Sequence, residues 1–106
     1  MKGRIKSTVQ IQRIFKKGER VENLFFKLFL LKERTSKGGF SVIVGRRYGS
    51  AVERNRIKRV YREILRNELR ESGEFFHLLL LPKGISKRTS YDRLKSRVGE
   101  VLQAFK

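Results

Sequence analysis

The chain has 106 residues, of which 27 are Lys or Arg and only 10 are Asp or Glu, so its formal net charge is +17. This length suits one domain with one modest core, and the apolar share of 39% argues against a wholly disordered chain. Charge this far from neutrality repels itself in a compact fold, and a polyanionic partner is the simplest reason for it. Nucleic acid is the commonest such partner for a small domain, and a membrane surface is the rival interpretation.

Several protein classes are excluded by composition. The chain has no cysteine, which rules out disulfide scaffolds, Cys-based zinc sites and thiol catalysis. No apolar run approaches the roughly 18–20 residues that span a bilayer, and neither terminus carries a lipidation signal. The charged residues 1–6 are not followed by an apolar stretch of signal-peptide length. We therefore expect a cytoplasmic protein with no membrane partner.

The first half of the chain predicts one helix and two strands. Residues 8–17 have helical periodicity, with Ser7 or Thr8 as a cap and Gly18 as a stop; one broad side is formed by Val9, Ile11 (or Gln12), Ile14 and Phe15. Residues 24–31 are short, aromatic and nearly all apolar, as in a strand with a buried face. A turn at 35–39 leads into a second strand at 40–44, so these two strands are expected to form a hairpin.

The second half predicts a long helix, a strand and a last helix. Residues 51–71 place an apolar arc against the core and a basic arc opposite it; the expected core positions are Val52, Ile57, Val60, Tyr61 and Ile64, and the basic arc is Arg54, Lys58, Arg59, Arg62, Arg66 and Arg70. The continuous apolar run 75–81 is typical of a strand covered on both faces. Ser90 is expected to cap a helix over 91–105, whose inward positions are Leu94, Val98, Val101, Leu102 and Phe105.

The predicted order of elements is therefore α-β-β-α-β-α. It contains no internal repeat, linker or low-complexity tract, so residues 1–106 are expected to form a single RNA-binding domain. Because the long helix is preceded and followed by a strand, the last strand should join the same sheet as the first two. The expected fold class is α/β, in two layers of the α+β kind, with helices packed on a small sheet.

A nuclease that acts without a partner is disfavoured. Two-metal nucleases cluster carboxylates around their ions, but this chain has one Asp and nine Glu, mostly interleaved with Arg or Lys as in solvated ion pairs. Its one histidine, His77, lies inside the apolar run and is more readily a packed structural residue than a general base. We expect no catalytic residue in the protein.

The binding interpretation is stronger, because basic residues concentrate between positions 46 and 62. Arg guanidinium groups match phosphate oxygens in bidentate geometry, and each phosphate contact releases counterions. A merely soluble helix face is the alternative, but solubility would be met by mixed charge, and few Glu dilute this run. The expected RNA-binding residues are Arg46, Arg47, Arg54, Asn55, Arg56, Lys58, Arg59 and Arg62.

Aromatic residues form a second feature. Phe15, Phe25 or Phe26, and Phe29 are either plain core or the lining of a groove in which bases or sugars stack, with Lys16, Lys17 and Lys27 beside them. The residues alone leave both interpretations open.

The segment 49–63, GSAVERNRIKRVYRE, resembles the signature of the bacterial ribonuclease P protein family: a Gly, a small polar residue, Ala-Val, Arg-Asn-Arg, Lys-Arg and a final Arg-Glu. Residues 14–18, IFKKG, are similar to the family's first helix and its Gly stop, and the order and spacing of elements agree over nearly the whole chain. Three positions depart from the family pattern, namely Ile11 for Phe, Gly45 for Ser and Tyr48 for a smaller aliphatic residue.

The resemblance implies a protein subunit that assists a catalytic RNA in removing the 5′ leader of precursor tRNA. It implies that the basic helix faces the RNA subunit, that Mg²⁺ is bound mainly by that RNA, and that the protein carries no covalent cofactor. It places the leader in a cleft whose matching positions are Phe15, Lys16, Phe26, Lys27, Phe29 and Lys83.

A metal-associated loop of the family would fall near the first strand-strand turn, with no ligands assigned. The partners would be the RNA subunit, in a 1:1 complex with a protein monomer, and precursor tRNA. The family fold also has a left-handed β-α-β crossover. The alternatives are a ribosomal or other structural RNA-binding protein and a stand-alone nuclease.

Overall fold

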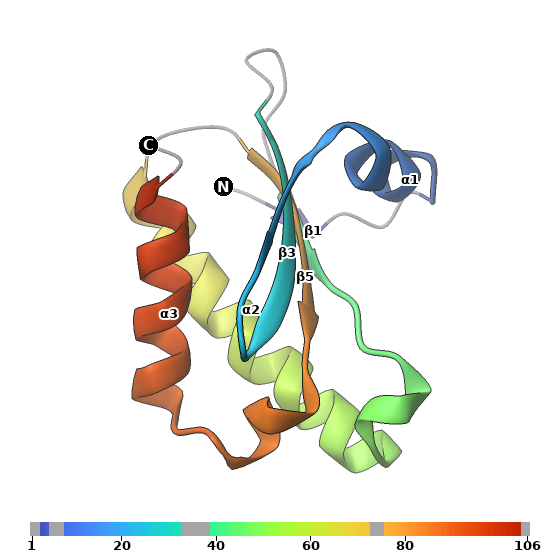
Figure 1. The fold of residues 1–106 in the computed structure, drawn as a ribbon, viewed down its shortest axis with the longest axis vertical. Coiled ribbons are helices and arrows are strands. Elements are labelled where there is room, and N and C mark those ends of the chain that lie inside the picture. Colours follow the sequence, from blue (N-terminus) through green and yellow to red (C-terminus); the bar gives the residue numbers. More distant parts are fainter. Residues whose placement is uncertain (1–2, 5–7, 33–38, 73–75, 105–106) are drawn as a thin grey trace.

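The computed structural model describes residues 3–4, 8–32, 39–72 and 76–104 (Figure 1). In chain order its elements are β1 (Gly3–Arg4), α1 (Thr8–Lys17), β2 (Glu19–Glu22), β3 (Phe26–Lys32), β4 (Gly39–Val42), the 3₁₀ helix η1 (Arg46–Tyr48), α2 (Ala51–Ser72), β5 (Phe76–Pro82), the 3₁₀ helix η2 (Gly84–Arg88) and α3 (Tyr91–Ala104). The three predicted helices are confirmed, with bounds that differ from the expected ones by one residue at most.

The three predicted strands are present as β3, β4 and β5, but the chain also forms β1 and β2, which the sequence pattern did not indicate. Strand β2 has only one apolar residue, Val21, among charged neighbours, so it lacks the apolar run expected of a strand. Of the predicted turn at 35–39, only Gly39 lies within the described residues, and it begins β4.

The five strands form one mixed sheet in the order β1-β4-β5-β3-β2. Strand β5 pairs antiparallel with β3 and parallel with β4. The predicted hairpin between the strands at 24–31 and 40–44 is therefore wrong, because β5 lies between them. A strand that is apolar on both faces is best buried at the centre of the sheet, and β5 is the strand with that property.

The hairpin of this sheet is formed by β2 and β3, which pair antiparallel from Glu19 with Leu30 to Glu22 with Lys27. Asn23 makes the turn, because its side-chain Oδ1 accepts hydrogen bonds from the backbone N–H groups of Phe25 (2.8 Å) and Phe26 (3.0 Å). Such a local side-chain to backbone bond is what favours Asn in turns.

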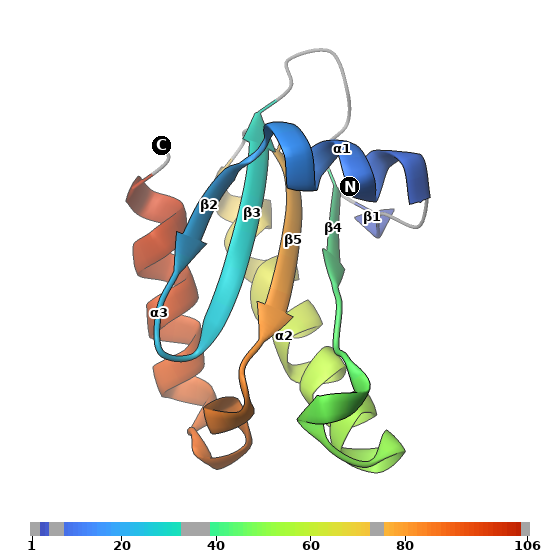
Figure 2. The same ribbon diagram turned by 45° about the vertical axis from the view of Figure 1, so that its right-hand side comes forward.

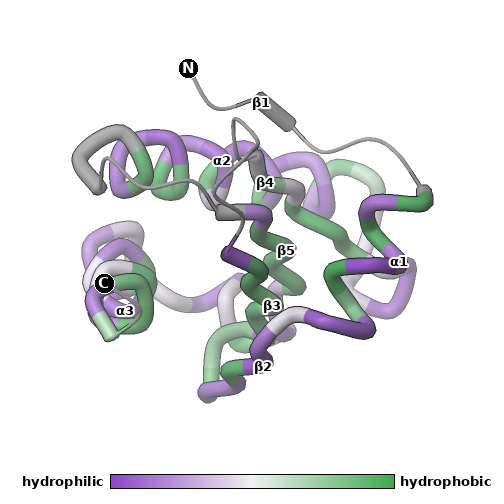
Figure 3. Tube along the Cα trace, turned by 90° about the horizontal axis from the view of Figure 1, so that it is seen from above, coloured by the Kyte–Doolittle hydropathy of each residue, from purple (hydrophilic) through white to green (hydrophobic). Residues whose placement is uncertain are grey.

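The sheet lies between helices on both faces. Figure 3 shows the hydrophobic stretches of β3 and β5 between α1 on one side and α2 and α3 on the other. The larger core cluster joins the sheet to α2 and α3, and a smaller cluster, centred on Ile14 and Leu79, joins it to α1. Within β5, Leu78 and Leu80 belong to the first cluster and Leu79 to the second, so the continuous apolar run is explained.

The apolar face of α2 is mostly as predicted. Ile57, Tyr61 and Ile64 are buried, and Val60 packs at the edge of the same cluster. Val52, however, is 78% exposed and is not core. It precedes Tyr61 by nine residues, which at 100° per residue places it half a turn around the helix from the buried face.

Helix α3 also follows its prediction. The Oγ of Ser90 accepts a hydrogen bond from the backbone N–H of Arg93 at 3.3 Å, as an N-cap does. Leu94, Val98 and Leu102 are buried, and Val101 packs against the same cluster. Phe105, the last expected inward residue, lies outside the described residues.

A buried chain of hydrogen bonds joins α2 to the loop regions at one end of the sheet. The hydroxyl of Tyr61 and the Oγ of Ser86 in η2 are 2.8 Å apart, and Ser86 donates to the backbone oxygen of Phe25 at 2.8 Å. Since Ser86 donates its one proton to Phe25, the Tyr61 hydroxyl is the donor of the other bond. Burial raises the pKa of Tyr61, so this phenol stays protonated.

The β4-α2-β5 connection has the uncommon hand. Strands β4 and β5 are parallel neighbours, and α2 lies behind the sheet in the view of Figure 2. Followed from β4 through α2 to β5, the path is left-handed (Figure 2), as the family resemblance implied and contrary to nearly all such connections.

Truncating Ile64 to Ala should lower the free energy of unfolding by roughly 2–4 kcal/mol, because its side chain is fully buried between α2 and the sheet. Val52→Ala, a truncation on the exposed side of the same helix, should change it by less than about 0.5 kcal/mol. Chemical denaturation of both variants measures the difference. A small loss at Ile64 together with a large one at Val52 would mean that the helix is docked by its other side.

Candidate nucleic-acid interface

The start of α2 is fixed by a reciprocal pair of hydrogen bonds. The backbone N–H of Glu53 donates to Ser50 Oγ at 3.1 Å, and the backbone N–H of Ser50 donates to Glu53 Oε1 at 2.9 Å. This is a capping box, and it determines where the first helical turn begins. The hydrogen bond from Ser50, followed by the charge of Lys87, lowers the pKa of Glu53. The basic residues that follow therefore start from a well-defined position.

The eight predicted RNA-binding residues lie on two consecutive elements, η1 and α2. Arg46 and Arg47 are exposed on η1, and Asn55, Arg56 and Arg59 are exposed on α2. Arg54, Lys58 and Arg62 follow one another at intervals of four residues and are half-buried, so the expected single outward arc is divided into an exposed and a half-buried row. Their side chains together form a basic surface, here called the α2 surface.

The opposite face of the sheet carries the aromatic residues. Because side chains alternate along a strand, Lys27, Phe29 and Leu31 of β3 face α1 and are half-buried. Helix α1 crosses only one end of this face (Figure 2), so the rest of the face has no helix over it. We call this side of the sheet the α1 face.

Helix α1 sits close to the sheet because Gly18 follows it. A Cβ at Gly18 would lie 2.6 Å from the backbone oxygen of Ile14 and 3.1 Å from that of Leu30. The helix thus brings Phe15 against Phe29, with ring centroids 4.8 Å apart in an edge-to-face arrangement. Phe15 remains 39% exposed, and the next residue, Lys16, is also exposed. Two aromatic rings and nearby cations therefore meet on this face.

Phe26, which the sequence analysis places in the leader-binding cleft, does not lie with this group in the structure. Its side chain is fully buried in the larger cluster and meets the ring of Tyr61 at 6.0 Å, on the side of the sheet that α2 covers. Phe26 and Phe29 are three residues apart on one strand, and an odd spacing points two side chains to opposite faces.

A charged group at the other end of the α1 face was not predicted. Glu22 of β2 accepts hydrogen bonds from Lys83 Nζ and from Arg20, both at 2.6 Å, and lies directly across from Lys27. The bond from Lys83, then that from Arg20, lowers the pKa of Glu22 to about 2. Arg20 also lies over the Phe29 ring, 6.0 Å from its centroid. The signal that could have revealed this strand is the pair of turn-favouring residues, Gly18 and Asn23, that lie on either side of it.

Among the residues that the structure describes, no three His, Asp or Glu side chains come together as a metal site would require. His77 is 6% exposed within β5, which supports its structural interpretation. None of the helices described is both long and apolar enough to cross a membrane.

Comparison with known proteins agrees with both the motif and the fold. A family model described as ribonuclease P matches residues 1–106. This chain belongs to the ribonuclease P protein family. A relative from Finegoldia magna, a ribonuclease P protein component, is 33% identical over 94 residues, which cover 88% of this chain and 81% of the relative. Another from Acholeplasma laidlawii is 26% identical over 98 residues and covers 92% and 84%.

Solved structures of family members have the same fold. The ribonuclease P protein of Staphylococcus aureus superposes with a TM-score of 0.82 at 27% identity, covering 97% of this chain and 94% of that one. The protein from Thermotoga maritima reaches 0.83 at 24% identity and covers 95% and 96%. The present chain is thus the protein subunit of ribonuclease P, a tRNA-processing endoribonuclease and ribonucleoprotein.

Replacing Glu22 with Gln should lower the melting temperature near pH 7, and this difference should shrink as the pH falls. The folded-state pKa of Glu22 is depressed from 4.5 to about 2, so its ionised form stabilises the fold above pH 4.5, and that contribution is lost between pH 4.5 and 2. Melting curves of both proteins over this range measure it. Glu100→Gln, which removes the same charge from an exposed ion pair on α3, corrects for the change of net charge. A difference that stays constant down to pH 2 would contradict the assignment.

Proposed function

We propose that this subunit holds two RNA ligands on opposite faces of its sheet. The RNA subunit of ribonuclease P binds the α2 surface, and the single-stranded 5′ leader of precursor tRNA binds the α1 face. The observation that carries the proposal is the separation of chemistry across the sheet: exposed Arg side chains on η1 and α2 on one side, and the accessible Phe15–Phe29 pair on the other. Two ligands bound in this way do not compete for space.

The α2 surface suits a folded RNA backbone. Arg guanidinium groups bind phosphate oxygens through two parallel hydrogen bonds, and a helix presents them at fixed spacing. Arg46 and Arg47 extend the surface before the capping box, so it spans two elements rather than one helix face. The net charge of +17 supplies long-range attraction to a polyanion, and release of counterions supplies affinity.

The α1 face suits an unpaired strand. Unstacked bases bind to exposed aromatic rings with little sequence preference, and adjacent cations track the phosphates. Phe15 and Phe29 offer the rings, and Lys16 and Lys27 offer the charge. Lys83 borders the same face, where its pairing with Glu22 offsets its charge until a phosphate draws it away. Phe26 is excluded, as its burial requires.

The protein's part in cleavage is then positional. We assign the chemical step to the RNA subunit, where bound Mg²⁺ would lower the pKa of a water molecule and so supply the nucleophile. The α2 surface fixes the protein on that RNA and reduces repulsion between catalyst and substrate. The α1 face holds the leader, so that the scissile phosphate is presented in one orientation. The protein acts in the cytoplasm as a monomer in a 1:1 complex with the RNA subunit and has no covalently bound cofactor.

Replacing Arg54, Arg56 and Arg59 together with Ala should weaken binding to the RNA subunit, and the slope of log K against log salt should fall by about one for each phosphate that the variant no longer neutralises. Titration of the RNA subunit at several salt concentrations measures both quantities. The matched control replaces three exposed cations of α3 with Ala, namely Arg93, Lys95 and Arg97, so that both triple variants lose the same positive charge. Equal effects of the two triple variants would mean that only net charge matters and that α2 is not the binding surface.

Phe29→Ala in the holoenzyme should weaken binding of precursor tRNA by about tenfold, since a base stacked on an aromatic ring contributes about 1–3 kcal/mol. Affinity for mature tRNA, which has no leader, should stay nearly unchanged. Phe15→Ala should act in the same way. Leu31→Ala is the control, because it truncates a half-buried side chain of the same strand and face without removing a ring. Equal losses for precursor and mature tRNA would assign Phe29 to the core alone.

A further inference from the structure

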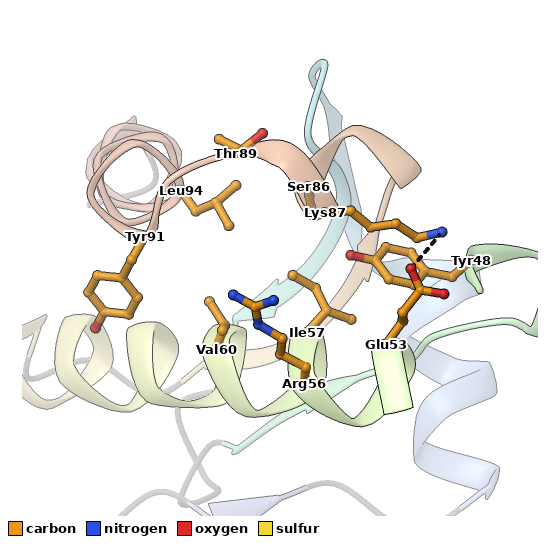
Figure 4. Close-up of a pocket in the computed structure, with 10 residues that line it drawn as sticks. All are labelled: Tyr48, Glu53, Arg56, Ile57, Val60, Ser86, Lys87, Thr89, Tyr91 and Leu94. Carbon is orange, nitrogen blue, oxygen red and sulfur yellow. Dashed lines mark ion pairs between the residues drawn. The ribbon is translucent and has the colours of Figure 1, made fainter. Parts of the chain in front are cut away.

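A pocket of about 160 Å³ lies between the first half of α2 and the turn from η2 into α3 (Figure 4). Arg56 and Val60 point into it from α2, and Tyr91 and Leu94 close it from α3. Its volume is far below that of sites for drug-sized ligands and suits a single heterocyclic ring. No residue of the α1 face lines it.

The pocket opens beside the α2 surface. Arg56 belongs to both, since it is one of the exposed cations of α2 and its guanidinium group points into the pocket in Figure 4. Tyr48, at the far end of the pocket, directly follows Arg46 and Arg47 on η1. An RNA backbone bound along η1 and α2 would therefore pass the mouth of the pocket.

The lining combines an apolar floor with a polar rim. Leu94, Ile57 and Tyr48 are 1%, 5% and 7% exposed, so the floor is part of the protein core. At the rim, Lys87 lies 4.8 Å from the centre of the Tyr48 ring and 3.6 Å from a carboxylate oxygen of Glu53. A base has the matching character, with apolar faces and a polar edge, and a carboxylate accepts hydrogen bonds from exocyclic amino groups. A phosphate fits poorly, because an apolar floor and Glu53 both oppose it.

We propose that this pocket receives one unpaired nucleobase of the RNA subunit, turned out of its stack. The exposed Arg side chains of η1 and α2 hold the RNA backbone outside the mouth, while the base packs against Val60 and Tyr91 beside the guanidinium group of Arg56. Specific recognition of RNA uses such unstacked bases, whose edges and faces are open to a protein. The proposal rests on the binding of the RNA subunit to the α2 surface. Because phosphates repeat along the RNA backbone, phosphate contacts alone do not fix the position of the protein along the RNA, whereas one base in this pocket would fix it.

Filling the pocket with Val60→Phe tests the proposal. Val60 is half-buried on α2, and a larger side chain there occupies the space meant for a base. Val101→Phe is the matched control, since Val101 is also half-buried, also helical and packed on the same core cluster, but does not line the pocket. Tyr91→Leu is a second variant, which removes the ring from the wall and keeps an apolar side chain. Melting curves establish that each variant is folded.

Two measurements are made on the complex with the RNA subunit. In the salt titration, Val60→Phe and Tyr91→Leu should each weaken binding by about tenfold with an unchanged salt slope, because a base carries no charge. In base-specific chemical probing of the RNA, one nucleotide that the wild-type protein protects should become reactive with both variants, and stay protected with Val101→Phe.

The outcomes separate this proposal from the one on which it rests. If both pocket variants bind like Val101→Phe while the triple Arg variant of α2 loses affinity and slope, the pocket is empty in the complex and only this proposal falls. If the pocket variants lower the salt slope, the occupant is a phosphate and the base is ruled out. If neither the pocket variants nor the triple Arg variant affects binding more than its control, α2 does not face the RNA subunit and both proposals fall.

Discussion

Strand β5 is buried on both faces, with Leu78 and Leu80 in the cluster under α2 and α3 and Leu79 in the cluster under α1. A strand of this kind must have a neighbour on each side and a helix on each face, because water can reach neither set of its side chains. The coverage is unequal. Two helices pack on one face, while α1, which at ten residues is about 15 Å long, covers only part of the other. Helix α1 buries Leu79 of the central strand, but it is too short to cover the whole sheet, and the rest of the α1 face therefore stays open.

The unequal coverage explains why one small chain can present two chemically unlike surfaces. On the side with two helices, the apolar side chains are buried in the core. The outer faces of the helices carry charged residues, such as Arg59 and Arg66 of α2. On the side with one helix, half-buried side chains such as Phe29 and Leu81 remain within reach of a ligand. A rigid basic helix is suited to duplex or folded RNA, whereas an aromatic sheet face is suited to a single strand. The sheet between them keeps the two surfaces apart.

The helices and most of the basic residues of the fold could be predicted from the sequence, whereas the strand order and the pocket could not, for physical reasons. The helices have long periodic patterns and local caps, such as Ser50 and Ser90, so their bounds were predicted almost to the residue. The strand order was not, because pairing is decided by contacts far apart in sequence, and a charged edge strand such as β2 has no apolar pattern. Phe26 was grouped with Phe29 although their odd spacing already separates them on a strand. The pocket could not be foreseen, since it joins Tyr48, Arg56 and Tyr91 through tertiary packing alone.

The Asn23 turn sets the register of β2 against β3, and with it which side chains of β2 lie beside Lys27 and Phe29. Seven residue pairs with β5 hold β3 itself in place, so one residue inserted between Glu22 and Phe26 would exchange the two sides of β2, moving Arg20 away from the Phe29 ring and Glu22 away from Lys83. The basic helix would be untouched, so under the proposed function such a chain would keep its affinity for the RNA subunit while its leader-binding face changes. Natural selection can therefore vary the residues of this turn far more readily than their number, and among relatives the length from Gly18 to Phe29 should drift less than the sequence within it.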